Sequence, residues 1–543
     1  MKYINKTGLI LIILSIVCSC ADLDTFPEGG IITNDQVKEN SEKDPTRANA
    51  KVAGMYGILG LQHCIYGEAA NRHDDFGYPA ICLSQDLNGP DMSCIDDGFN
   101  WFTVSSDFSD RTENYANPYM RFAIFYKQIA AANDLIKSID EDTEHPTLKI
   151  HRAQAKAVRA FDYLSLVPYY QFKYVGNEDK LGVPLMTEVA SDDNPRAKLK
   201  DIYELIIKDL NYAIEKLEGY ERKSKGEVDQ QVAYGIRARA HLYMEKWTEA
   251  AADADKALQG YKPYSVADIS KPGFIDATDP NWMWAILIGP DKVPYVYPTW
   301  PSKLSSFAGY GYTTGVGAYK TINKLLFSLI PATDVRKGWW VDDKLHSSNL
   351  STVEWNGVKG DAVARLVIGG TKVPFLQYTN VKFGQYGGPG GTTNAGDWCI
   401  MRAEEMILIK AEGLAMSGGN GNKVLEDFIK TYRDPEYICK PASGKELQDE
   451  IWIQRRIELW GEGFAMADIM RLQKNIVRFV KGDKDTNIPI TFRFNIAYND
   501  EWLLLRFPLQ EINSNPDVKQ NEGSKRPEAE DGEDLRDGIN YKL

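Results

Sequence analysis

The segment 233–258, AYGIRARAHLYMEKWTEAAADADKAL, most narrows the folds open to this chain. Apolar residues recur every three to four positions in both halves of the segment, and the pattern breaks near residues 245–247. This spacing predicts two helices joined by a short turn. Small alanines at the contact positions let two antiparallel helices approach closely. Such a helical hairpin must pack on further helices to bury its apolar faces.

Three earlier segments have the same apolar spacing and can supply those neighbours: 117–139, 153–167, which Pro168 closes, and 198–217. The alanine-rich hairpin resembles a tetratricopeptide unit, in which helix pairs stack side by side. We therefore predict a mainly α fold with a tetratricopeptide-like helical-repeat scaffold, that is, an α-α superhelix.

The pattern changes between residues 261 and 397. Short apolar runs such as 282–286 and 363–368 alternate with stretches rich in Gly and Pro, and helical periodicity is nearly absent. These features predict loops and short strands laid against the scaffold, forming a loop-rich ligand face. Helices are predicted again at 401–416 and 450–473, and the charged tail from Glu522 is predicted to be an extended surface segment.

The first twenty residues differ from the rest. Two lysines precede an apolar stretch of about ten residues, which is too short to cross a bilayer and has the length of a signal-peptide core. The stretch ends in Val-Cys-Ser-Cys, which resembles the lipobox of bacterial lipoproteins. We predict a signal peptide over 1–19 and lipidation of Cys20. An ordinary secreted protein or an uncleaved anchor are the alternatives.

The composition excludes some functions. A net charge of -13 argues against nucleic-acid binding, because a basic face is needed to neutralise phosphates. The six histidines are too widely spread for a metal site, and we expect no cofactor. Asp86-Leu-Asn-Gly-Pro-Asp91 lacks the ligand set of an EF-hand and is interpreted as a turn. Five cysteines remain after Cys20, namely Cys64, Cys82, Cys94, Cys399 and Cys439. The first three either include one disulfide or are buried free thiols, and the sequence leaves both alternatives open.

The order of the segments resembles the SusD/RagB family of surface lipoproteins from Bacteroidetes. In the first half, residues 155–170 (AKAVRAFDYLSLVPYY) look like the family's Arg-Ala-aromatic helix, and 181–187 (LGVPLMT) look like the turn that follows. Gln154 and Gln171 depart from the residues usual in the family.

The second half carries more specific motifs. Residues 402–413 (RAEEMILIKAEG), 454–472 (QRRIELWGEGFAMADIMRL) and 503–523 (LLLRFPLQEINSNPDVKQNEG) are similar to family motifs in the same order. Gln454 and Ala465 depart from the pattern. The resemblance runs over essentially the whole mature chain, so we predict one SusD/RagB-like domain over 20–543, with halves 20–260 and 261–543.

The resemblance implies a function without catalysis. A SusD-like protein is a lipid-anchored outer-membrane lipoprotein that faces the cell exterior, binds a nutrient, usually a glycan, and delivers it to a SusC-like TonB-dependent transporter. A surface-anchored glycan hydrolase and a protein-interaction module without a small ligand are the alternatives. The identity of the ligand stays open, because specificity resides in the loops.

The charged residues of the 454–472 motif are interpreted as structural. Spacing on one helix places Arg455, Glu458 and Glu462 on a common face, and Asp468 and Arg471 on another. We predict that they are partly buried ion pairs that staple the C-terminal helices to the repeat scaffold. A hydrolase with Glu458 and Glu462 as acid and base is disfavoured, because a glycosidase pair must flank the substrate bond from two sides.

Two loop clusters have the chemistry of sugar binding, in which aromatic faces stack on sugar rings and polar groups take the hydroxyls. The first cluster holds Asp74, Asn100 and Trp101, and the second holds Tyr297 and Trp300. We predict these five as ligand-binding residues and expect alanine at either tryptophan to weaken binding without unfolding the chain. Trp282 and Trp284 are instead predicted to lie in the core.

Overall fold

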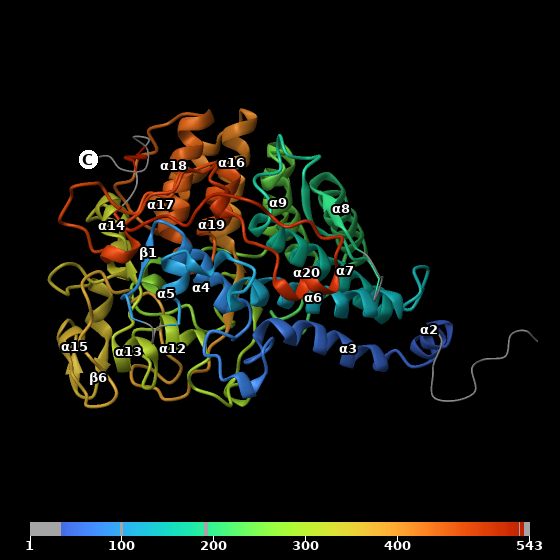
Figure 1. Ribbon diagram of the computed structural model, residues 1–543, viewed down its shortest axis with the longest axis horizontal. Helices are drawn as coiled ribbons and strands as arrows, with labels where there is room; N and C mark the ends of the chain where they lie inside the picture. Colours follow the sequence, from blue (N-terminus) through green and yellow to red (C-terminus); the bar gives the residue numbers. More distant parts are fainter. Residues whose placement is uncertain (1–33, 98–100, 189–193, 531–532, 537–543) are drawn as a thin grey trace, which may run out of the picture.

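The computed structural model describes residues 34–97, 101–188, 194–530 and 533–536 of the chain. The predicted signal peptide and Cys20 lie outside these residues. The chain is mainly α-helical, as predicted, with a few short strands. In Figure 1, helices α6 to α9 occupy the right side, α16 to α19 the upper part, and the loop-rich segments with α12, α13 and α15 the lower left.

The helices and strands follow one another along the chain in this order, with the longest helices in the two regions that the sequence predicts. They are α2 (Asn34–Lys43), α3 (Thr46–Gly57), α4 (Tyr78–Asn88), β1 (Met92–Ser93), α5 (Thr103–Ser106), α6 (Ala116–Lys137), α7 (Pro146–Leu166), β2 (Leu181–Pro184), β3 (Arg196–Lys198), α8 (Leu199–Lys216), α9 (Gln230–Tyr243), α10 (Trp247–Ala257), α11 (Val266–Ile269), β4 (Trp282–Ile286), α12 (Trp300–Leu304), α13 (Tyr312–Val316), β5 (Thr321–Ile322), α14 (Lys324–Leu329), β6 (Glu354–Trp355), β7 (Val358–Lys359), α15 (Ala362–Arg365), β8 (Trp398–Arg402), α16 (Ala403–Ser417), α17 (Gly421–Tyr432), α18 (Gly444–Glu458), α19 (Ala465–Leu472) and α20 (Leu509–Ser514).

The scaffold is a row of consecutive antiparallel helices. Helix α6 packs on α7, α7 on α8, α8 on α9, and α9 on α10, while α10 packs on α16 of the second half and α16 on α17 and α18. The predicted hairpin over 233–258 is confirmed: α9 and α10 are separated by three residues, of which Glu245 has a φ of 54°. A Cβ at Gly413 of α16 would lie 2.5 Å from the carbonyl oxygen of Trp247, so this glycine allows α16 to pack closely on α10.

Buried ion pairs hold the row of helices together. Arg159 of α7 donates to Asp209 of α8 at 2.8 and 3.0 Å and to the amide oxygen of Asn133 of α6 at 2.7 Å. Arg239 of α9 donates to Glu405 of α16 at 2.5 and 2.6 Å. These arginines therefore connect neighbouring helices rather than face solvent.

The loop-rich region between α10 and α16 contains the short helices α11 to α15 and strands of at most five residues. Strand β4 pairs antiparallel with β8, and Trp282 and Trp284 of β4 are buried, as predicted. The prediction of a strand at 363–368 is wrong: its first residues form helix α15, whose buried Val363 belongs to a small cluster of apolar residues under these loops.

The predicted helix 450–473 is divided in two. Helix α18 ends at Glu458 and α19 begins at Ala465, because Gly461 and Gly463 between them have φ values of 84° and 90°. A Cβ at Gly463 would lie 2.5 Å from the Cβ of Cys82, so a side chain there would collide with α4. The prediction that Glu458 and Glu462 share one helix face is therefore wrong.

The interpretation of residues 86–91 as a turn is only partly right, because α4 extends to Asn88. Asp86 is buried, and its carboxylate accepts hydrogen bonds from the backbone N–H groups of Gly463 at 3.0 Å and Ala465 at 3.2 Å. It thus caps the start of α19. Burial raises the pKa of Asp86 from 3.8 to about 7 despite these hydrogen bonds.

Replacing Asp86 with asparagine is expected to flatten the pH dependence of stability between about pH 4 and 7. In that range the native state keeps a proton that the unfolded state has lost, so the free energy of unfolding falls as the pH rises, by at most about 1.4 kcal/mol per pH unit. An asparagine at this position would keep an acceptor oxygen and would not titrate. Urea denaturation of both proteins at several pH values measures the difference, and equal pH dependence in both would contradict the raised pKa.

Helices α2, α3 and α17 were not predicted from the sequence, although α3 packs on α6 and α7. The five described cysteines are free thiols, so the alternative of a disulfide among Cys64, Cys82 and Cys94 is not realised.

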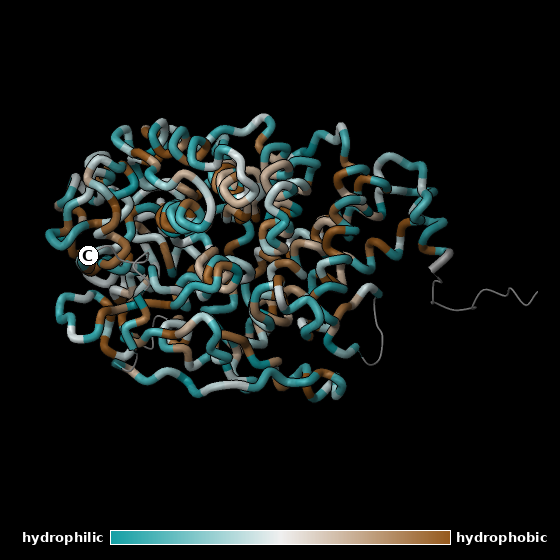
Figure 2. The backbone as a smooth tube through the Cα atoms, turned by 90° about the horizontal axis from the view of Figure 1, so that it is seen from above, coloured by the Kyte–Doolittle hydropathy of each residue, from teal (hydrophilic) through white to brown (hydrophobic). Residues whose placement is uncertain are grey.

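Figure 2 shows short apolar and polar stretches alternating along the tube. Within the described ranges, no helix combines the length and the apolar character that crossing a bilayer requires.

Candidate ligand-binding site

An open pocket of about 520 Å³ lies beside Trp101, between the loop before α4, the segment 101–104 and the start of α6. Its walls combine aromatic and polar side chains, as sugar sites do. They include Tyr66, Arg72, Asp74, Trp101, Asn114 and Tyr115.

Trp101 is held in a strained conformation at the edge of this pocket. Its φ of 66° lies in the left-handed region, which costs a bulky residue on the order of 1–3 kcal/mol. The indole Nε1–H donates to the hydroxyl oxygen of Tyr312 at 2.9 Å, and the ring is half-buried. The surroundings therefore fix the orientation of a ring that keeps one part exposed to the pocket.

His73 joins Trp101 to a second pair of rings. Its imidazole lies 5.4 Å from the Trp101 ring and stacks on Tyr297 at 5.5 Å with an interplanar angle of 12°. Nδ1 lies 2.6 Å from the Tyr312 hydroxyl, and Nε2 lies 3.2 Å from the amide oxygen of Asn71. Burial, followed by the charge of Lys303, lowers the pKa of His73, so the ring is neutral at pH 7.

Arg72 and Asp74 provide the polar groups of the pocket. They form an ion pair at 2.6 Å, and the Arg72 guanidinium lies over the rings of Tyr66 and Trp101 at 5.3 and 5.7 Å. Asp74 is buried, which raises the pKa of its carboxyl group. Its Oδ1 has no hydrogen-bond partner within the described part of the chain. Such an oxygen is costly to leave unpaired.

The loop that carries these groups is fixed by its own backbone. Asp75 Oδ2 accepts hydrogen bonds from the N–H groups of Ile65 at 3.0 Å and Tyr66 at 2.9 Å. Gly77 has a φ of 78°, and a Cβ there would lie 2.1 Å from the carbonyl oxygen of Leu59. A glycine is therefore required where the loop turns into α4, and the turn places Arg72 and Asp74 at the pocket.

The structure brings three of the five predicted ligand-binding residues together. Asp74 and Trp101 line the pocket, and Tyr297, with 43% of its surface exposed, joins them through His73. Asn100 lies outside the described residues. His73 and Tyr312 were missed, because an isolated histidine and a tyrosine in a Gly-rich loop carry no sequence pattern.

Trp300 lies elsewhere, so its prediction as a ligand-binding residue needs correction. Its side chain is only 2% exposed, its indole N–H donates to the carbonyl oxygen of Gly396 at 2.8 Å, and its ring packs against Phe383 and Trp398. It has no free face for a ligand. Replacing Trp300 with alanine would remove core packing and destabilise the fold. The prediction that this variant stays folded and binds ligand more weakly is therefore withdrawn.

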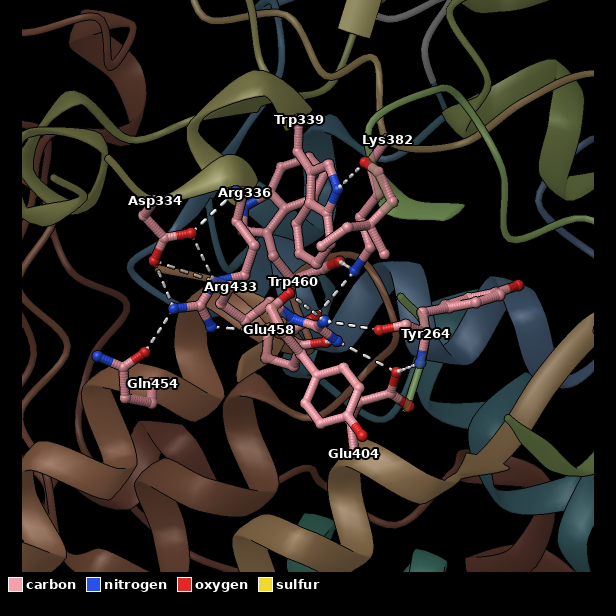
Figure 3. Close-up of polar contacts among 12 residues, drawn as sticks. Tyr264, Asp334, Arg336, Trp339, Lys382, Glu404, Arg433, Gln454, Glu458 and Trp460 are labelled. Carbon is pink, nitrogen blue, oxygen red and sulfur yellow. Dashed lines mark hydrogen bonds and ion pairs between the residues drawn. The ribbon is translucent and has the colours of Figure 1, made fainter. Parts of the chain in front are cut away.

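A second polar cluster lies buried in the C-terminal half, and Figure 3 shows its central carboxylate, Glu458. This carboxylate accepts hydrogen bonds from three arginines at 2.8 to 3.2 Å. Four cations face four carboxylates in the cluster: Arg336, Lys382, Arg402 and Arg433, with Asp334, Glu404, Glu458 and Glu462.

The surrounding cations lower the pKa of both Glu458 and Glu462, despite burial, so both are ionised. A general acid must instead hold a proton near neutral pH. Neither residue lines the pocket beside Trp101. We therefore interpret the cluster as a set of ion pairs that stabilises the fold. It gives no support to the alternative of a hydrolase with these two residues as acid and base.

The predicted ion pairs between the C-terminal helices and the repeat scaffold are present, but Glu458 does not form them. Arg471 of α19 donates to Glu412 of α16 at 2.6 and 2.8 Å, and Asp468 accepts from both Arg455 and Arg471 at 2.8 Å. Since α16 packs on α10, these pairs connect α18 and α19 to the tetratricopeptide-like hairpin.

Comparison with protein families gives two matches. The model described as "SusD family" matches residues 345–523, and the model described as "Starch-binding associating with outer membrane" matches residues 83–242. The first includes the charged cluster around Glu458 except Asp334 and Arg336, and the second includes Trp101, helices α6 to α8 and all of α9 but its last residue.

Individual proteins are similar over most of the chain. A SusD-like protein of Formosa agariphila is 23% identical over 521 residues, which cover 88% of this chain and 92% of that protein. A SusD-like carbohydrate-binding protein from Bacteroides vulgatus has a similar solved structure, with a TM-score of 0.71, 23% identity and coverage of 88% and 98%. The solved structure of a laminarin-binding SusD-like protein has a TM-score of 0.60, 18% identity and coverage of 88% and 99%.

Proposed function

Because this chain belongs to the SusD/RagB family, we propose that it binds a glycan in the pocket beside Trp101. The observation that carries the proposal is the geometry of that pocket. The half-buried ring of Trp101 and the Arg72–Asp74 ion pair both line the pocket. A sugar needs groups of both kinds, an apolar face for its C–H surface and polar groups for its hydroxyls.

The two charged groups of the pocket favour hydroxyl recognition. Arg72 is already paired with Asp74, so the pair presents donors and an acceptor with little net charge. The neutral ring of His73 and the rings of Trp101 and Tyr297 add apolar surface. The names of the relatives, which include binding of carbohydrate and of laminarin, support the same class of ligand.

The location and partner follow from the family and are also proposals. We propose that Cys20 carries the lipid that holds the chain at the outer membrane, facing the cell exterior. There it would deliver glycan to a SusC-like TonB-dependent transporter. The chain would be no enzyme, because holding the glycan requires no covalent step. The description of one matching family as associating with the outer membrane supports this placement.

Native affinity electrophoresis against a panel of neutral and acidic polysaccharides tests the proposed function. We expect at least one polysaccharide in the gel to retard the protein, and the same polysaccharide to keep its length after incubation with the protein. Absence of retardation across the panel would contradict glycan binding, and shortened products would favour the hydrolase. Specific capture of a barrel protein without any glycan binding would favour the interaction module.

A further inference from the structure

A chain of hydrogen bonds connects Trp101 to His73 through the hydroxyl group of Tyr312. The indole Nε1–H of Trp101 donates to the Tyr312 oxygen at 2.9 Å, and this oxygen lies 2.6 Å from His73 Nδ1. At the other end of the chain, His73 Nε2 lies 3.2 Å from the amide oxygen of Asn71. An indole N–H can only donate, and an amide oxygen can only accept. The two ends therefore fix the direction of each hydrogen bond between them.

These directions require one form of the His73 ring. Because Asn71 offers an oxygen to Nε2, Nε2 carries a proton. The Tyr312 hydroxyl accepts the N–H of Trp101 and donates its own proton to Nδ1, so Nδ1 carries none. The ring is thus the neutral Nε2–H tautomer. A ring with two protons would donate from both nitrogens, and the Tyr312 hydroxyl would lose its acceptor.

The groups around His73 also act against a second proton on its ring. The charged and titratable ones are Arg72 and Asp74 on its own loop, His63 on the segment before it, Tyr297, Lys303 of α12 and Tyr312 of α13. Burial, then the charge of Lys303 and then His63 lower the pKa of His73. The carboxylate of Asp74 is already paired with Arg72 at 2.6 Å. The surroundings thus favour the tautomer that the hydrogen bonds require.

Trp101 depends on such contacts, because its φ of 66° is unfavourable for a bulky residue. We propose that His73 and Tyr312 are positioning residues of the pocket. Neutral His73 holds the Trp101 ring in place through Tyr312, and a second proton on His73 releases the ring. This inference rests on the proposed function, and it makes glycan affinity highest at neutral pH and lower in acid.

The pH dependence of glycan affinity tests the inference by calorimetry, with the polysaccharide that retards the wild-type protein as the probe. We expect the wild-type affinity to fall roughly three- to tenfold between about pH 7.5 and about pH 5. His73→Asn offers Tyr312 an amide oxygen that does not titrate. Its affinity should be below that of the wild type at neutral pH, because the stacked ring is lost, and nearly constant with pH.

Two further variants complete the comparison. Tyr312→Phe removes only the hydroxyl that connects the two rings, so it should also remove the pH dependence, and it replaces His73→Asn if that variant is unstable. His346→Asn is the matched control, because the His346 side chain is 66% exposed and pairs with Asp361 instead. Its affinity and its pH dependence should equal those of the wild type.

The indole N–H signal of Trp101 in NMR spectra gives a second readout, which needs no glycan. The signal is identified by its absence from the spectrum of Trp101→Phe. We expect it to shift with pH in the wild type, with a midpoint below 6.5, the ordinary pKa of histidine, and to stay constant in His73→Asn.

Two results would overturn the inference. One is a pH dependence of affinity that persists in both His73→Asn and Tyr312→Phe, because another group such as Asp74 would then titrate. The other is an indole signal of Trp101 that does not respond to pH. Failure of the proposed function is distinguishable, because the indole signal would then still titrate through His73 while no polysaccharide retards the protein.

Discussion

Replacing Trp101 with alanine is expected to weaken glycan binding by about 2–4 kcal/mol, roughly 30- to 1000-fold in Kd, while the protein stays folded. The ring is one of the aromatic rings that line the pocket, and it also orders its neighbours through the hydrogen bond to Tyr312 and the contact with His73. Its loss removes the stacking surface and releases the partners that surround it. Calorimetry with the polysaccharide selected by electrophoresis measures the effect.

Two further substitutions distinguish the contribution of the Trp101 ring to binding from the effect of its backbone conformation on stability. Trp101→Phe keeps an aromatic face but loses the N–H that bonds Tyr312, so it should retain part of the affinity. Trp101→Gly removes the ring and also the penalty of a φ of 66°, so it should bind as poorly as alanine with less loss of stability. If Trp101→Gly bound glycan as wild type does, the pocket would not be the binding site.

Replacing Glu458 with glutamine is expected to lower the free energy of unfolding by about 3–5 kcal/mol, because one charge of a buried, paired set is removed. The side chain keeps its volume, so no cavity forms. Arg336, Arg402 and Arg433 each lose a carboxylate at 2.8 to 3.2 Å and meet an amide that can donate toward them. Removing this carboxylate leaves positive charge uncompensated in the protein interior.

Urea denaturation measures this loss of stability, and Glu354→Gln is the matched control. Glu354 pairs with Lys359 at 3.1 Å on the surface, where both side chains are more than half exposed, so its loss should cost under about 1 kcal/mol. A cost for Glu458→Gln as small as that of the control would show that the cluster does not stabilise the fold. A catalytic role for Glu458 would instead predict lost turnover with little change in stability.

The scaffold could be predicted because its signal is local. The alanine-rich hairpin and the apolar stripes of α6 to α8 repeat within a few turns, and the structure places helices at each of them. The division of α18 from α19 was not predicted, although Gly461 and Gly463 are weak helix formers whose presence allows a break. It depends on a distant contact, in which Gly463 lies against Cys82 of α4.

Aromatic and acidic residues in loops were the basis for predicting the ligand-binding residues. Of these, Asp74 and Trp101 line the pocket and Tyr297 lies beside it, and their contact with a ligand stays a prediction. Trp300 has the same residue type and a similar loop context, but it turns into the core against Trp398. The fold alone decides which of two such rings is buried. His73, which connects the rings, becomes visible only once the loops are placed together.

The structure of the protein with a bound oligosaccharide decides where the glycan binds. We expect a sugar ring stacked on Trp101, with one hydroxyl within hydrogen-bonding distance of the Arg72–Asp74 ion pair and the chain leaving toward Tyr297. Density for the sugar on another face, with no sugar in the pocket beside Trp101, would contradict it.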